Sequence, residues 1–369
     1  MSIDIGIVGL PGSGKTTIFN ALTRGKADTE KASPHIGTAK VPEPRLETLS
    51  GMLNPKRVVP AEVKYIDIGA LGMGPARDTG AGGQWLAQLS SLAQLGNVDA
   101  LIYVVRAFSD ESIPHVEGSL DIERDIANIN LELTFSDLAL LERRLEGIGA
   151  SLKGAKPDER QRIIREQELL MKIKADFEND MPLRERTLSP EEARMMANYQ
   201  LLTAKPLLLV VNIGEDQLPQ AASLEAELGS RYSRPRCRII TLCGKLEMEL
   251  AQLDKEAAEG FRAEFGLVEP GPDRVIRLSY DLLGLLSFFT IASGEVKAWS
   301  IRNGTDAVKA AGKIHSDMER GFIRAEVISY DDLVRCGSIA EARKAGLLRL
   351  EGKSYIVQDG DVITFLFNI

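Results

Sequence analysis

The sequence predicts an α/β protein with a mostly parallel sheet, an inserted pair of long helices and a small C-terminal domain. A short β-rich run at the start leads into a glycine-rich loop and then into apolar residues at helical spacing. Later strands are almost wholly apolar, which is typical of a parallel sheet covered by helices on both faces. A long middle region spaces its apolar residues by threes and fours, which indicates helices packed along a seam.

Length and composition exclude several classes of protein. The 369 residues fit two to three domains, and 44% hydrophobic with 27% charged residues is typical of a globular chain rather than a disordered or fibrous one. The formal charge of −8 argues against binding nucleic acid through bulk charge. The three cysteines show no metal-ligand spacing, no basic leader precedes the first strand, and no apolar run approaches the roughly 20 residues that span a bilayer. We therefore expect a cytoplasmic protein.

The loop after the first strand matches the full phosphate-binding pattern Gly-x-x-x-x-Gly-Lys-Thr. Glycines let backbone N–H groups turn inward around phosphate oxygens, and the helix that follows adds the positive end of its dipole. We expect Lys15 to bridge the outer phosphates, which makes it a catalytic as well as a binding residue, and the Thr16 hydroxyl to ligate Mg²⁺. The predicted phosphate-binding residues are Gly9, Pro11, Gly12, Ser13, Gly14, Lys15, Thr16 and Thr17.

A phosphate site of this kind also needs an acidic residue on the metal side, at the end of another strand. Asp67 closes the apolar strand 63–68, and we expect it to act on Mg²⁺ through a water molecule. The alternative is a helix cap or turn residue. Ras-like GTPases have Asp-x-x-Gly at this place, whereas here Gly69 comes one position early and Ala70 supplies the next N–H group.

The segment after the apolar strand 207–211 is the candidate base-binding element. GTPases have Asn-Lys-x-Asp here, and the aspartate accepts hydrogen bonds from two guanine groups that adenine lacks. This chain has Asn212, Ile213 and Glu215 at the corresponding places, so discrimination in favour of guanine should be weakened. We expect these three residues to shape the base pocket; an ordinary strand-to-loop turn is the alternative.

The remaining regions complete the predicted architecture. Apolar residues from Leu131 and Phe135 to Leu152 form a helical seam, a break follows near residue 155, and a second helix begins, so residues 119–203 are predicted to be an antiparallel hairpin. The tail is predicted to be a separate domain whose strands include 296–301 and 353–357. The predicted domains are therefore 1–118 with 204–282 for nucleotide binding, 119–203 for the hairpin, and 283–369 for the tail.

The sequence resembles the YchF (Obg-like) ATPases of the Obg branch of P-loop proteins over essentially its whole length. The resemblance rests on residues 6–11 with the phosphate loop, on Asn212-x-x-Glu215-Asp216, and on four tail motifs at residues 311–317, 320–326, 359–362 and 365–368. It implies a Ras-like nucleotide domain, an inserted coiled-coil hairpin and a C-terminal β-grasp TGS domain. It also implies a cytoplasmic Mg²⁺-dependent enzyme that prefers ATP to GTP and associates with ribosomal RNA or protein, not with DNA or membranes.

The same resemblance supplies one catalytic candidate and three departures. The family's hydrolysis-assisting histidine corresponds to His115, for which a hydrogen-bonded loop histidine is the alternative, and Leu71 stands where related GTPases have a glutamine. Gly12 replaces the family's usual asparagine, which puts potassium dependence in doubt, and Gly69 is displaced. The segment before residue 41 is short, so the threonine that would complete the Mg²⁺ shell is Thr38, with Thr29 as the alternative. His35 and His315 are predicted to be structural residues. Arg77 and Arg106 are predicted to be surface or structural residues, with assistance to catalysis as the alternative.

Three functional hypotheses stay open at this point. The first is a Mg²⁺-dependent ATPase, the second is a nucleotide-gated ribosome- or protein-binding module with little or no hydrolysis, and the third is a GTP-preferring GTPase. A kinase is disfavoured because nothing in the sequence suggests a second substrate pocket or a lid.

Overall fold

The computed structural model describes residues 3–25, 35–68, 95–115 and 117–368. By its internal contacts the chain divides into two compact units. The large unit comprises Asp4–Gly37 and Tyr65–Pro272, and the C-terminal unit comprises Met1–Ile3, Thr38–Lys64 and Asp273–Ile369. The three-part domain division stays a prediction; it did not anticipate that the segment Thr38–Lys64 groups with the C-terminal residues.

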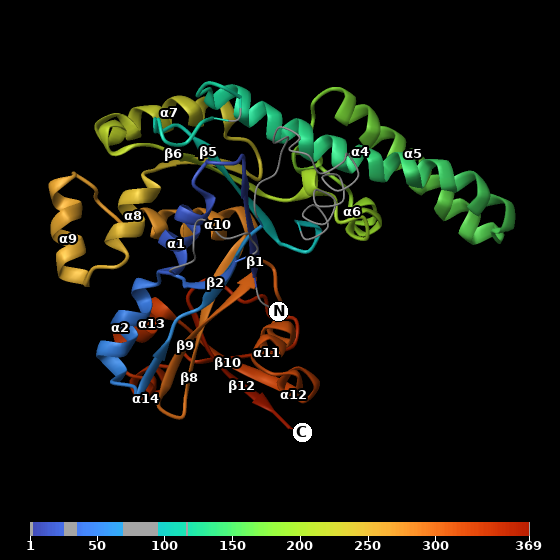
Figure 1. The fold of residues 1–369 in the computed structure, drawn as a ribbon. Helices are drawn as coiled ribbons and strands as arrows, with labels where there is room; N and C mark the ends of the chain where they lie inside the picture. Colours follow the sequence, from blue (N-terminus) through green and yellow to red (C-terminus); the bar gives the residue numbers. More distant parts are fainter. Residues whose placement is uncertain (1–2, 26–34, 69–94, 116, 369) are drawn as a thin grey trace. The chain divides into compact units, whose positions relative to one another are not determined.

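The first six-stranded sheet has the order β2-β4-β1-β5-β6-β7, and its strands β1, β5, β6 and β7 lie wholly in the large unit (Figure 1). Its strands are β1 (Asp4–Gly9), β2 (His35–Lys40), β4 (Glu62–Asp67), β5 (Ala100–Arg106), β6 (Leu207–Asn212) and β7 (Cys237–Leu242). The four strands from β1 to β7 in this order are parallel neighbours. Their register places Gly9 beside Val104 and Arg106 beside Asn212, so their carboxyl ends share one edge, where open α/β sheets bind ligands.

The predicted apolar strands are confirmed by their burial. Every residue of β5 and β6 is buried, and the side chains of this sheet join a core that also takes in the start of α4. The large unit contains α1 (Lys15–Thr23), α4 (Ile122–Gly154), α5 (Pro157–Glu178), α6 (Pro190–Ala197), α7 (Ala221–Tyr232), α8 (Gly244–Leu250) and α9 (Lys255–Glu264), with 3₁₀ turns η1 (Leu183–Glu185), η2 (Leu202–Ala204) and η3 (Glu215–Gln220). Helix α1 packs against α8.

Helices α4 and α5 form the predicted hairpin and lie side by side (Figure 1). The break is where the sequence indicated it, because α4 ends at Gly154 and α5 begins at Pro157. The predicted seam is wrong in its first turns: Leu131 is 45% exposed and Phe135 is 61% exposed. The early part of α4 packs on the sheet through Leu133 and its neighbours, and the later part packs on α5, so the buried face changes partner along the helix.

The C-terminal unit contains a second, mixed sheet with the order β11-β10-β12-β8-β9-β3. Its strands are β3 (Arg57–Val59), β8 (Leu285–Ala292), β9 (Glu295–Arg302), β10 (Phe322–Ser329), β11 (Arg349–Glu351) and β12 (Asp361–Phe367). Its helices are α2 (Pro44–Leu53), α11 (Ala307–Ile314), α12 (Ser316–Arg320), α13 (Tyr330–Cys336) and α14 (Ile339–Lys344), and α10 (Gly271–Leu283) begins at the boundary between the units. A core of phenylalanine, alanine and branched aliphatic side chains joins α11 to the sheet.

Two details of the predicted tail change in the structure. Residues 353–357 form a turn and an isolated bridge rather than a strand, although Val357 is buried, and the short strand is Arg349–Glu351 instead. The edge strand β3 comes from far earlier in the chain, and it pairs in parallel with β9. Across the ranges that the structure describes, no helix combines the length and apolar character that crossing a membrane requires.

Candidate nucleotide-binding site

The glycine loop follows β1 in a conformation that depends on its glycines. Gly14 has φ of 89°, and a Cβ atom at this position would lie 2.2 Å from Nδ2 of Asn212. Gly12 also has positive φ, at 73°, and a Cβ atom there would meet Ile113 at 2.9 Å. Larger residues at either position would strain the backbone and displace a neighbour. The space beside Gly12, where the family usually has an asparagine side chain, is therefore limited by Ile113.

Lys15 and Ser13 show that this loop fits phosphate. The Lys15 ammonium is buried and donates to the Leu10 carbonyl at 2.9 Å. Burial lowers the pKa of Lys15 to about 8, and the Asp67 carboxylate opposes part of this change. The Ser13 hydroxyl is also buried, and it has no hydrogen-bond partner among the residues that the structure describes. A buried cation held by one carbonyl and an unsatisfied hydroxyl are both groups that phosphate oxygens would satisfy.

The predicted metal side is assembled around Asp67. The Thr16 hydroxyl donates to Oδ2 of Asp67 at 2.7 Å, and the Asp67 side chain is fully buried. Hydroxyl and carboxylate oxygens are ligands that Mg²⁺ accepts, directly or through water, so these two residues fit the cation. The Nδ1 atom of His35 lies 3.5 Å from the same Asp67 oxygen. The sequence predicted a structural role for His35 and did not predict this contact. The one signal near it was that the segment between α1 and residue 41, which includes β2, is short.

The predicted base-binding segment is tied to the glycine loop through Asn212. Its Nδ2 donates to the Ser13 carbonyl at 2.9 Å, and its Oδ1 accepts from the Gly244 amide at 3.0 Å. Asn212 thus ties the glycine loop to the start of α8. Ile213 is 2% exposed, and its side chain packs in the core of the large unit. Glu215 is 45% exposed, and its carboxylate lies 3.7 Å from the Lys245 ammonium, an ion pair that sequence reasoning missed.

Two hydrogen bonds fix the orientation of the His115 ring. Its Nδ1 accepts from the Glu117 amide at 3.2 Å, and its Nε2 lies 3.1 Å from Oδ2 of Asp125, which is buried at the start of α4. Since Nδ1 is an acceptor, Nε2 carries the ring proton and donates a hydrogen bond to Asp125. The hydrolysis-assisting role of His115 stays a prediction, and this conformation matches the alternative of a hydrogen-bonded loop histidine.

Arg106 is structural in this conformation. Its guanidinium donates to the carbonyls of Phe108, Asp110 and Ile113 and lies over the Phe108 ring. It therefore shapes the loop that limits the space at Gly12. Thr38 is exposed on β2. Its role as a cation ligand stays a prediction. Several residues considered from sequence lie outside the described ranges: Thr29, Gly69, Ala70, Leu71 and Arg77.

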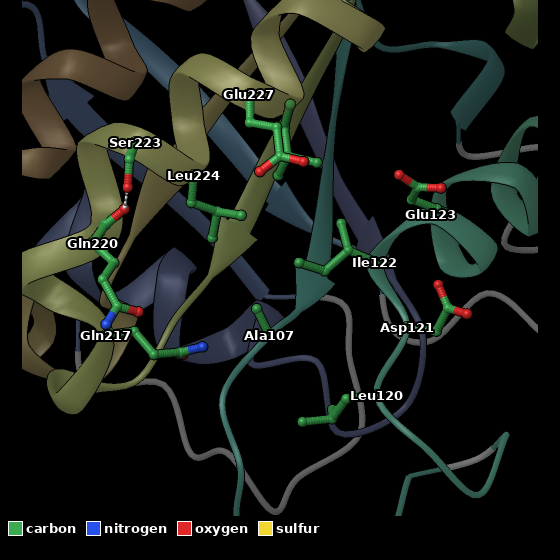
Figure 2. A pocket seen from close by; sticks show the side chains of 11 residues that line it. Ala107, Leu120, Asp121, Ile122, Glu123, Gln217, Gln220, Ser223, Leu224 and Glu227 are labelled. Carbon is green, nitrogen blue, oxygen red and sulfur yellow. Dashed lines mark hydrogen bonds between the residues drawn. The ribbon is translucent and has the colours of Figure 1, made fainter.

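A separate cavity of about 540 Å³ lies between the start of α4 and the η3–α7 segment (Figure 2). Its lining combines an apolar floor with carboxylate, amide and hydroxyl groups, from Ala107, Leu120, Asp121, Ile122, Glu123, Gln217, Gln220, Ser223, Leu224, Glu227 and Leu228. Gln217 accepts from the Gly214 amide and so holds the turn that begins with Glu215. None of the predicted site residues lines this cavity.

The glycine loop between strand and helix, the Thr16–Asp67 pair and the Asn212 bridge define a Ras-like P-loop nucleotide-binding protein, as the sequence predicted. A family model described as 50S ribosome-binding GTPase matches residues 4–141. A second model, YchF-GTPase_C, described as a protein of unknown function (DUF933), matches residues 285–368.

The chain belongs to the YchF family, which confirms the resemblance. It is 40% identical over 376 residues to the Bacillus subtilis (strain 168) protein named Ribosome-binding ATPase YchF, and 38% identical over 382 residues to the Escherichia coli O157:H7 protein of that name. Both alignments cover 100% of each chain. The solved Schizosaccharomyces pombe YchF GTPase is 31% identical, with a TM-score of 0.84 over 99% of this chain and 98% of that one.

Proposed function

We propose that this chain is a Mg²⁺-dependent nucleoside triphosphatase that prefers ATP to GTP and works with the ribosome in the cytoplasm. The main support is the phosphate cradle, in which the Thr16 hydroxyl already contacts Asp67 and the buried Ser13 hydroxyl lacks a partner within the described ranges. The ribosomal part is carried over from the names of the bacterial relatives.

Each residue of the cradle has a distinct part in this proposal. Amides from Gly12 to Thr17 hold the phosphates, and Lys15 leaves the Leu10 carbonyl to contact the outer ones. Thr16 would supply a ligand to the cation, and Asp67 would orient that hydroxyl and act on the cation through water. Mg²⁺, when bound, neutralises charge on the outer phosphates. Catalysis then consists of charge stabilisation and positioning of water.

The preference for ATP is proposed from the base side. Asn212 places the segment correctly, but Glu215 offers a longer and half-exposed carboxylate that Lys245 also attracts. Such a carboxylate is a weaker clamp for the two guanine donors than a short aspartate held in place. The relatives differ in the nucleotide that their names give, ATPase for the bacterial proteins and GTPase for the fission yeast one.

Calorimetric titration with non-hydrolysable ATP and GTP analogues in Mg²⁺ tests the proposal. We expect the ATP analogue to bind more tightly, and Lys15→Ala to lower both affinities by about tenfold to a hundredfold. GTP affinity tenfold above ATP affinity, equivalent to about 1.4 kcal/mol, would reverse the assignment of the base pocket. Unchanged affinity in Lys15→Ala would contradict the site itself.

One observation favours a second candidate, a nucleotide-gated binding module with little hydrolysis. Both His115 nitrogens are engaged, by Glu117 and Asp125, so this histidine must break two contacts before it can contact a nucleotide or water. Single-turnover hydrolysis with and without ribosomes separates the candidates. Stimulated hydrolysis supports the enzyme, whereas nucleotide-dependent cosedimentation without hydrolysis supports the module.

A further inference from the structure

Side chains from two elements converge on one oxygen of the metal-side carboxylate, which a third element carries. Thr16 from α1 lies 2.7 Å and His35 from β2 lies 3.5 Å from Oδ2 of Asp67, at the end of β4. Asp67 is fully buried and the His35 side chain is 20% exposed. An imidazole nitrogen, a hydroxyl and a carboxylate that face one point are three donor types that divalent cations accept in proteins.

His35 is held in this position by α1. Its ring packs against Phe19, with 6.1 Å between the ring centroids. Two residues later, a Cβ atom at Gly37 would lie 2.8 Å from Thr23 and 3.0 Å from Phe19, so the strand lies close on the helix that carries Thr16. The imidazole is therefore placed by packing on the phosphate-loop helix and is not a free surface side chain.

Strand alternation makes His35 the residue of β2 that faces the carboxylate. His35 and Gly37 lie on one face, whereas Ile36 is 65% exposed and Thr38 is exposed on the other. The threonine predicted to complete the cation shell is thus on the opposite face of the strand from the imidazole.

We propose that His35 is a nitrogen ligand of the divalent cation that enters with the nucleotide, and that it sets the metal preference of the site. The inference rests on the proposed function, since the cation is expected to bind together with the triphosphate. Mg²⁺ prefers oxygen ligands and dehydrates reluctantly, whereas imidazole suits first-row transition metals. Mn²⁺ is the first-row metal that shares the oxygen preference of Mg²⁺, so it also suits the hydroxyl and carboxylate of this site. His35 therefore gives Mn²⁺ a larger advantage over Mg²⁺ than Thr16 and Asp67 alone would give.

Calorimetric titration with AMP-PNP in Mg²⁺, in Mn²⁺ and in EDTA measures this advantage. In His35→Asn we expect the ratio of Mn²⁺-supported to Mg²⁺-supported affinity to fall about tenfold, with affinity in EDTA and the thermal midpoint unchanged. His315→Asn is the matched control, because His315 caps α12 in the C-terminal unit and asparagine is also a good cap. It should leave the ratio unchanged.

A spectroscopic measurement gives an answer even if the variant unfolds. The Mn²⁺–AMP-PNP complex of the wild-type chain should show electron spin-echo modulation from a directly bound nitrogen, and this signal should change when histidine is isotope-labelled at nitrogen. The chain has three histidines, so the label is selective. Labelling without effect, or an unchanged metal ratio in folded His35→Asn, overturns the inference while nucleotide binding stands. Wild-type protein that binds no nucleotide in any of these conditions overturns both proposals.

Discussion

Two fully buried carboxylates of the large unit have different partners. Asp67, at the end of β4 beside the glycine loop, accepts from the Thr16 hydroxyl and lies beside the His35 imidazole. Asp137, on α4, accepts from the amides of Leu202 and Thr203 and from the Thr203 hydroxyl. Side-chain partners can turn to a cation or phosphate, whereas backbone amides are fixed by the fold. The comparison separates a carboxylate suited to binding from one that anchors α4 of the hairpin to the turn η2, which comes shortly before β6 in the chain.

Removal of the anchoring carboxylate should have the largest effect. Asp137→Ala leaves two buried amides and a hydroxyl without their acceptor, so we expect the free energy of unfolding to fall by about 3 kcal/mol or more. Urea unfolding followed by circular dichroism measures this. A loss below about 1 kcal/mol would show that the junction does not depend on Asp137.

Asp67→Ala should weaken nucleotide binding more than it lowers stability. We expect the Mg²⁺-dependent gain in nucleotide affinity to fall about tenfold to a hundredfold, because Thr16 loses the group that orients it. The free energy of unfolding should change by about 1 kcal/mol, less than in Asp137→Ala. Titrations in Mg²⁺ and in EDTA, with urea unfolding beside them, measure both quantities. Equal stability losses in the two variants would break the comparison.

Titration of Asp137 should contribute to the pH dependence of the free energy of unfolding. Burial raises the pKa of Asp137 to about 6, against the hydrogen bonds from Thr203 and Leu202. Between about pH 4 and 6 the folded chain then binds this proton more tightly than the unfolded chain, so this carboxyl makes the free energy of unfolding fall as pH rises. Asp137→Asn removes that contribution. The difference between wild type and variant, measured by urea unfolding at several pH values, should therefore change across this window and be constant above it.

The smallest effect is expected for Lys245→Ala, which removes the ion pair with Glu215 in the predicted base-binding segment. Glu215 and Lys245 are both substantially exposed, so Lys245→Ala should change stability by less than about 0.5 kcal/mol. It frees the Glu215 carboxylate, and we expect GTP-analogue affinity to rise a few-fold with little change for the ATP analogue. Competition titration measures the ratio. A fall in GTP affinity would indicate that Lys245 itself contacts the nucleotide.

Residues that act through local sequence were predictable. The glycine loop and Thr16 were predicted because a phosphate cradle needs fixed spacing between a strand and a helix. Asp67 was predicted because it closes another apolar strand, and the structure brings Thr16 and Asp67 together. The break between α4 and α5 was also found, because Gly154 and Pro157 act on their own backbone. Leu131 and Phe135 were assigned to the wrong face, because periodicity shows that a helix has a buried side but not which element covers it at each turn.

The sequence by itself determined the class of fold, the phosphate-binding loop and the membership in the YchF family, since these depend on short-range spacing and on similarity along the whole chain. The tertiary structure decided which side chains meet across long separations. It placed His35 beside Asp67, tied His115 to Asp125, and joined β3 to the sheet of the C-terminal unit. Such contacts depend on register and packing between elements far apart in the chain, and no single stretch of sequence encodes them.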